Sequence, residues 1–214
     1  MSETPDDRST WTHPAAATRF PPADESFAGD LMLKVARGLE DREDLQDQIT
    51  DLIESDEFAE VFPDDDEPSL DEALALLDEV IAEHDRVVTA TSEHVATWFE
   101  ALEELEERGV AFSFGQGFDT GEAAQDGFEE ASELEGAIGY GYSHLQDLDR
   151  LVLTGTLVVG FSGMSGRLDE EAATVARTIV EVVTNLGLPV TWSGDPGTRI
   201  EVGPLAWEVR AEED

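Results

Sequence analysis

Two residues with side chains suited to proton transfer, His144 and Asp147, stand three positions apart in the sequence. We expect a helix to begin here, directly after a strand, so that both side chains share one face of its first turn. An imidazole beside a carboxylate suits a general base with an orienting acid. It suits equally a structural corner, in which His144 holds the turn and Asp147 favours the helix N-terminus. We favour the corner, and the catalytic candidates are His144, Asp147 and Arg199.

A metal site is not predicted around this pair. A metal needs further ligands, and His84 and His94 fall in other predicted helices with no telling spacing. The acidic run 64–67 lacks the alternating ligands and the sixth-position glycine of an EF-hand loop. The sequence has no cysteine, which excludes disulfides, thiolate ligands and cysteine nucleophiles together. We therefore predict no metal and no cofactor.

Two glycine loops stand between a predicted strand and a predicted helix, where a phosphate loop would lie. The first, 115–121, has one residue more than the Rossmann spacing, and the acids Asp119 and Glu122 oppose phosphate binding, so a tight turn is favoured. The second, 160–166, is neither a Walker loop nor a nucleophile elbow, but its N–H groups could form an anion nest assisted by Arg167.

The ligand-binding candidates combine the second loop with aromatic residues of neighbouring strands: Tyr140, Tyr142, Gly163, Ser165, Gly166, Arg167 and Trp192. The two tyrosines alternate with glycines and so face one side of a strand, where core packing is the favoured role. Trp192 is expected in a hairpin held by a contact between Asp195 and Arg199, with a recognition rim as the alternative.

Acidity dominates the composition. The 214 residues include 51 acids and 12 bases, for a formal net charge of −39. Such self-repulsion is costly in ordinary cytosol but is screened in molar salt, where the Debye length is about 3 Å. The composition indicates a protein of a salt-accumulating halophile; the rival interpretation is a mimic of nucleic acid or a binder of a basic partner. No basic stripe exists to neutralise phosphates, so direct nucleic-acid binding is not expected.

No run of about 18 apolar residues is present, and no apolar signal core follows the N-terminus, so we expect a cytoplasmic protein without a membrane contact. Hydrophobic periodicity, capping signals and glycines predict helices near 27–37, 41–55, 69–86, 92–109, 119–133, 143–151 and 168–187. Ser69, Asp119 and Ser143 are the expected N-caps of the third, fifth and sixth of these helices, each with the spacing of a capping box. Strands are predicted at 110–114, 138–143, 156–161, 188–192 and 199–202, with 205–209 as a candidate last strand. The most apolar strand, 156–161, is expected to be central.

The fold class is therefore α+β: a helical N-terminal part packed on a C-terminal α/β sandwich with a mixed sheet of about five strands. We expect a disordered or loosely attached tail at 1–26, a helical region at 27–107, an α/β sheet domain at 108–210 and an acidic tail at 211–214.

Two short elements give the chain a family resemblance. The first reads Gly139-Tyr140 through His144 and then Gln146-Asp147; the second runs from Val190 through Trp192 and Asp195 to Arg199, with Trp207 and Arg210 after it. In this order they resemble an uncharacterised prokaryotic family, domain of unknown function 6891, over roughly residues 28–210. Many members have cysteines just after the first strand, where this chain has Phe114-Gly115-Gln116-Gly117. The resemblance therefore implies a fold, and any role of those cysteines cannot operate here.

We expect a non-enzymatic interaction or regulatory domain adapted to high salt, with an unidentified protein as partner. The alternative is a small-molecule or nucleotide-binding, hydrolase-like enzyme that uses His144, Asp147 and Arg199. Convergence of these three residues on one concave pocket would discriminate between the two classes.

Overall fold

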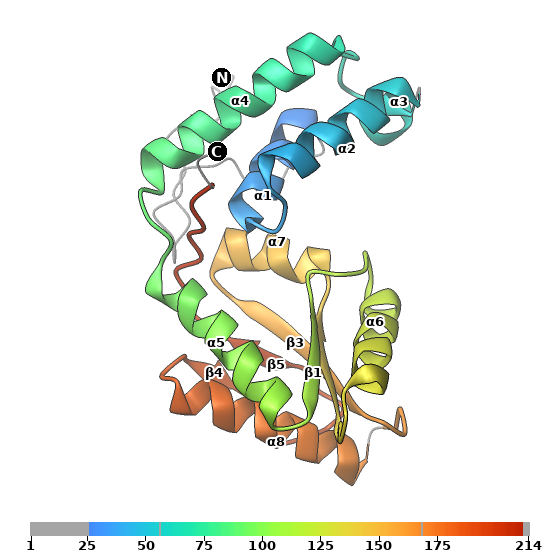
Figure 1. The fold of residues 1–214 in the computed structure, drawn as a ribbon, viewed down its shortest axis with the longest axis vertical. Coiled ribbons are helices and arrows are strands. Elements are labelled where there is room, and N and C mark those ends of the chain that lie inside the picture. Colours follow the sequence, from blue (N-terminus) through green and yellow to red (C-terminus); the bar gives the residue numbers. More distant parts are fainter. Residues whose placement is uncertain (1–25, 56, 168, 212–214) are drawn as a thin grey trace, which may run out of the picture. The chain divides into compact units, whose positions relative to one another are not determined.

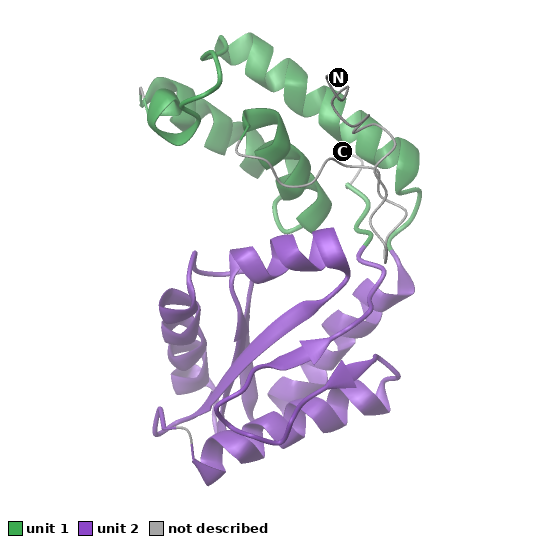
Figure 2. Cartoon of the chain, turned by 180° about the vertical axis from the view of Figure 1, so that it is seen from behind, with its two compact units in different colours: residues 1–91, 208–214 green, residues 92–207 purple. Residues whose placement is uncertain are grey.

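The computed structural model describes residues 26–55, 57–167 and 169–211, so the tails predicted at 1–26 and 211–214 lie almost wholly outside the described residues. The chain divides into two compact units (Figure 2). Unit 1 comprises residues 1–91 and 208–214, and unit 2 comprises residues 92–207. The described residues form eight helices and one five-stranded sheet, which confirms the predicted α+β class.

Unit 1 is helical. It contains α1 (Phe27–Arg37), α2 (Arg42–Glu54), the single turn α3 (Phe58–Val61) and α4 (Leu70–Val87). Helices α1 and α2 both pack on α4. Three aromatic rings, those of Phe27, Phe58 and Phe62, pack at centroid distances of 5.3–5.5 Å and attach α3 to the start of α1. The sequence pattern did not indicate α3, because one turn is too short to display a helical period.

Polar caps fix the helix boundaries in unit 1. The Ser69 hydroxyl accepts the Glu72 N–H while Glu72 accepts the Ser69 N–H, which is the predicted capping box of α4. Gly38 ends α1 with a φ of 68°, a left-handed conformation that favours glycine. Residues 208–211 complete the unit. The Arg210 N–H donates to Thr91 and the Ala211 N–H donates to Asp85.

Unit 2 contains α5 (Glu93–Glu107), β1 (Val110–Phe114), α6 (Thr120–Glu133), β2 (Gly139–Ser143), α7 (Leu145–Thr154), β3 (Leu157–Gly163), α8 (Glu170–Asn185), β4 (Val190–Thr191) and β5 (Ile200–Val202). The strand order is β1-β2-β3-β5-β4. Only β1 and β2 are parallel, and the other three pairs are antiparallel. Strand β3 is buried along its whole length at the centre of the sheet, as its apolar sequence predicts.

The alternation of glycine and tyrosine in β2 assigns the layers of unit 2. A Cβ on Gly127 of α6 would lie 2.8 Å from the Tyr140 ring, so α6 covers the tyrosine face. A Cβ on Gly139 would lie 2.5 Å from Val175 of α8, so α8 covers the opposite face. Helix α5 lies on the α8 side, because its Trp98 packs against Phe112 and Phe112 lies beside Gly141. The unit is a helix–sheet–helix sandwich (Figure 1).

Two local predictions are wrong. The candidate strand at 205–209 is irregular chain, because backbone groups of Leu205 and Ala206 bond to Gly155 and to the His94 ring instead of to a strand. Ser143 does not cap α7. It still pairs with Phe114 as the last residue of β2, its hydroxyl donates to the Val158 carbonyl, and the cap moves one residue on to His144.

Among the described helices, none is both long enough and apolar enough to cross a bilayer.

Candidate functional site

The His144 side chain caps a helix. His144 Nδ1 accepts the Asp147 N–H at 3.3 Å, and an Asp147 carboxylate oxygen accepts the His144 N–H at 3.3 Å. The Leu145 N–H donates to the Gly117 carbonyl, which ties the start of α7 to the loop after β1. Because Nδ1 acts as an acceptor, the proton of a neutral ring stands on Nε2, which lies 3.3 Å from Asp147 Oδ2. The imidazole is thus a reciprocal cap in a capping box with Asp147.

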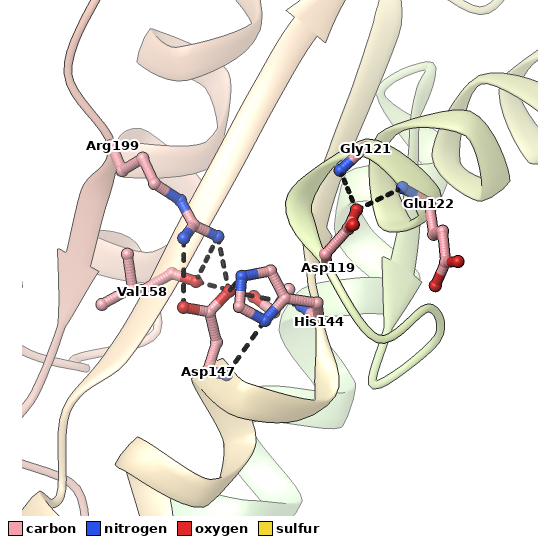
Figure 3. Close-up of polar contacts among 8 residues, drawn as sticks. Asp119, Gly121, Glu122, His144, Asp147, Val158 and Arg199 are labelled. Carbon is pink, nitrogen blue, oxygen red and sulfur yellow. Dashed lines mark hydrogen bonds and ion pairs between the residues drawn. The ribbon is translucent and has the colours of Figure 1, made fainter.

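Asp147 also forms an ion pair with Arg199, the residue directly before β5. Both terminal nitrogens of Arg199 reach the carboxylate, at 3.1 Å and 2.5 Å, and one of them also donates to the Val158 carbonyl (Figure 3). The Asp147 side chain is only 7% exposed and that of Arg199 is 31% exposed. A two-pronged guanidinium contact of this kind fixes geometry as well as charge. The expected contact between Arg199 and Asp195 is replaced by this ion pair.

The surroundings favour the neutral form of His144. Burial lowers its pKa, and Arg199 adds to that effect, while Asp147 and Asp119 oppose it. Asp119 is the N-cap of α6 and accepts the N–H groups of Gly121 and Glu122 (Figure 3). A neutral ring is what the cap requires, because a protonated imidazole has no lone pair to accept the Asp147 N–H.

The fold therefore brings together the side chains of His144, Asp147 and Arg199, but these side chains bind one another. Both Asp147 oxygens accept the guanidinium, and both ring nitrogens of His144 face groups of Asp147. A general base needs a lone pair directed at a substrate proton, whereas the Nδ1 lone pair of His144 is directed at the Asp147 N–H. The geometry supports the structural corner, locked by an ion pair from a distant strand.

The ligand-binding candidates lie at separate places in unit 2. Tyr140 is buried and packs against Phe128 and Tyr142. The Tyr142 ring lies over Gly160, where a Cβ would approach it to 2.2 Å, and Arg199 stands 5.7 Å from its centroid. This stacked contact is a cation–π arrangement.

The loop after β3 is a turn at the surface. The Gly166 N–H donates to the Gly163 carbonyl, and Ser165, Gly166 and Arg167 are exposed. Gly163 lies against Glu171 of α8. Trp192 is remote from this loop in sequence. It packs edge-on against Phe161 and donates its indole N–H to the Thr198 carbonyl across the predicted hairpin.

Within the described residues, no cluster of three or more histidine, aspartate and glutamate side chains is arranged to hold a metal ion.

Unit 2 contains a groove that the sequence pattern did not indicate. It has a volume of about 470 Å³ and lies between α5 and α6, above β1. Its lining has an apolar and an acidic part. We call the apolar part the floor, formed by Phe99, Leu102, Ala111, Phe112 and Leu134, and the acidic part the rims, formed by Glu103 and Glu106 on α5 and by Glu130 and Glu133 on α6. Phe99 is 43% exposed, a high value for an aromatic side chain. A second cavity, of about 400 Å³, lies in unit 1. None of the catalytic candidates lines either cavity.

The edge of the sheet runs along this groove. Among the residues that the structure describes, strand β1 is the first in the strand order and pairs with β2 alone. The Gly109 carbonyl and the Gly115 N–H both bond toward β2. Successive residues direct their backbone groups to opposite sides of a strand, so Val110, Phe112 and Phe114 direct theirs away from β2. One sequence signal could have indicated the groove: Phe99 and Leu102 stand three apart on α5, beside the inward stripe that contains Trp98.

The comparison with known proteins gives one result. The model of the family described as Domain of unknown function (DUF6891) matches residues 22–211. The chain belongs to this family. No curated protein and no solved structure matches it.

In this DUF6891 chain the two elements that carry the resemblance meet in space. Asp147 closes the first element and Arg199 belongs to the second, and the two side chains form the ion pair described above. The family resemblance is thus centred on a contact that fastens α7 to β5 across β3, through the Val158 carbonyl.

Proposed function

We propose that this chain is a protein-interaction module that takes a segment of a partner protein into the groove between α5 and α6. The observation that carries the proposal is an apolar groove, of which Phe99 is 43% exposed, beside the edge strand of the described sheet. Exposed apolar surface rimmed by polar groups is a mark of interaction sites. Strand edges are themselves sites where extended segments add to a sheet.

The cellular setting that we propose is the cytoplasm of a salt-accumulating cell. The net charge of −39 supports it, because repulsion among so many carboxylates is screened in molar salt.

The proposal predicts that peptide binding depends on the groove. A random peptide library displayed on phage is panned against the full chain in molar KCl, and the recovered peptides are measured against two variants. Phe99→Ser removes an aromatic ring from the groove, whereas Phe128→Ser removes one of equal exposure, 42%, from outside it. We expect Phe99→Ser to weaken binding at least tenfold and Phe128→Ser to leave it unchanged. Peptides that bind both variants equally, or a library without binders, would refute the proposal.

A further inference from the structure

We propose that the occupant of the groove is an extended basic segment of another protein, which adds as a strand to the open edge of β1. This inference rests on the proposed function and assigns the chemistry of the partner. Its three supports are the backbone of β1, the charges of the rims and the exclusion of a second copy.

The backbone of β1 supplies the pairing groups. Phe112 lines the groove and directs its N–H and C=O groups away from β2, as does the half-buried Phe114 at the end of the strand, whereas Val110 is fully buried. A helix laid in the groove would leave these groups without partners, whereas an extended segment would satisfy them. An added strand would also direct alternate side chains toward α5 and toward α6, because successive side chains point to opposite faces.

The negative charges of the rims favour a partner segment with positive charges. Glu103 and Glu106 stand on the α5 side and Glu130 and Glu133 on the α6 side. Burial raises the pKa of Glu130, and the neighbouring carboxylates of Asp126 and Glu106 raise it further. A cationic side chain would relieve this repulsion. Lysine or arginine fits both parts of the groove, since its aliphatic stem covers Leu102 or Leu134 while its charged end reaches a glutamate.

A second copy of the chain is disfavoured as the partner that adds to β1. Two β1 edges paired with each other would bring both sets of four rim glutamates together. Like charges across an interface oppose association. The same glutamates thus discourage self-pairing of an open edge and select a partner of opposite charge.

The test uses short synthetic peptides of lysine and valine, with glutamate–valine peptides of the same length as the charge control. Binding to the full chain is measured by fluorescence anisotropy over those KCl concentrations at which far-UV circular dichroism shows the chain to be folded. We expect the basic peptide to bind, with an affinity that falls as salt rises, and the acidic peptide not to bind.

A matched pair of variants locates the charges. Glu106→Gln with Glu130→Gln removes two groove carboxylates, and Glu100→Gln with Glu129→Gln removes two exposed carboxylates from the same helices outside the groove. The change in net charge is identical. We expect the groove double variant to weaken binding of the basic peptide about tenfold, and the control to weaken it less than twofold. Equal losses would mean that only overall charge attracts the peptide, and would overturn the inference.

Backbone methylation tests the strand pairing. A basic peptide with N-methyl groups on alternate amides is compared with one methylated on the intervening amides. One of the two should lose binding, because its methyl groups block the bonds to β1, and the other should retain it. Hydrogen exchange at Phe112 and Phe114 should slow when the competent peptide binds. Equal behaviour of the two peptides would overturn strand addition.

The outcomes separate this inference from the function on which it rests. One outcome is a set of library peptides that require Phe99 for binding and yet are neither basic nor extended. That result would support the proposed interaction module and would overturn the inference that its partner is a basic strand. Failure of every peptide to distinguish Phe99→Ser from Phe128→Ser would overturn both.

Discussion

At the residue scale, the positive charge of Arg199 compensates the negative charge of the buried Asp147 side chain. Breaking a buried ion pair leaves an uncompensated charge, and the loss is moderated where one partner still meets water, as Arg199 does at 31% exposure. We expect Arg199→Ala to lower the free energy of unfolding by about 2 kcal/mol, and Arg199→Lys by less, because lysine keeps the charge without the fork. Urea unfolding at fixed molar KCl measures both. A loss for Arg199→Ala below about 0.5 kcal/mol would show that the pair is a surface contact only.

His144 makes stability depend on pH. Burial lowers its pKa in the folded chain below the unfolded value of about 6.5, so the unfolded state binds more protons as the pH falls through that value. The stabilisation is complete above about pH 6.5 and is lost progressively below it, at no more than about 1.4 kcal/mol per pH unit for this group.

The non-titrating cap variant His144→Asn is the reference for that effect. We expect the difference in unfolding free energy between the natural chain and His144→Asn to shift against the natural chain as the pH falls from 7.5 toward 5.5. Burial also lowers the pKa of His84. The carboxylates and His84 are present in both proteins, so their contributions to the pH dependence cancel in the difference. A difference that stays constant with pH would contradict the assignment of a neutral capping imidazole.

At the element scale, Gly127 brings α6 close to the sheet. Replacing glycine by alanine in a helix ordinarily stabilises it by about 1 kcal/mol. Here the added Cβ would lie 2.8 Å from Tyr140 and 3.3 Å from the Gly141 carbonyl, so the helix would have to move away. We expect Gly127→Ala to destabilise the chain by about 1–3 kcal/mol.

The exposed Gln125 of the same helix provides the control. Comparison of Gln125→Ala with Gln125→Gly gives the ordinary helix preference for alanine at an open position, and its sign should be opposite to that at Gly127. Thermal unfolding followed by circular dichroism measures all three variants. A stabilising Gly127→Ala would mean that α6 does not pack this closely on β2.

At the scale of the whole molecule, the acidic surface predicts a requirement for salt. With 51 acids and 12 bases, removal of salt restores repulsion that molar KCl screens. We expect the far-UV circular dichroism to show unfolding when KCl is dialysed away and recovery when it is restored. Full retention of structure at low salt would contradict the proposed adaptation to high salt.

The chain passes from one unit to the other twice, after Thr91 and after Trp207. Helix α5 thereby belongs to unit 2 and residues 208–211 to unit 1, where Val209 lies directly against Gly38. This contact joins residues that lie far apart in the sequence, so no local sequence pattern predicts it.

The sequence by itself determined what local physics controls. Apolar periodicity, the caps at Ser69 and Asp119 and the glycine at position 38 located helices and strands to within a few residues, and the apolar run at 156–161 identified the central strand. The tertiary structure alone decided the sites. Arg199 meets Asp147 across 52 positions, Ser143 bonds to β3 and leaves the cap to His144, and helices from two separate segments form the groove over β1. These contacts depend on how the sheet is ordered and covered, and strand order is set by packing between segments that no short stretch of sequence contains.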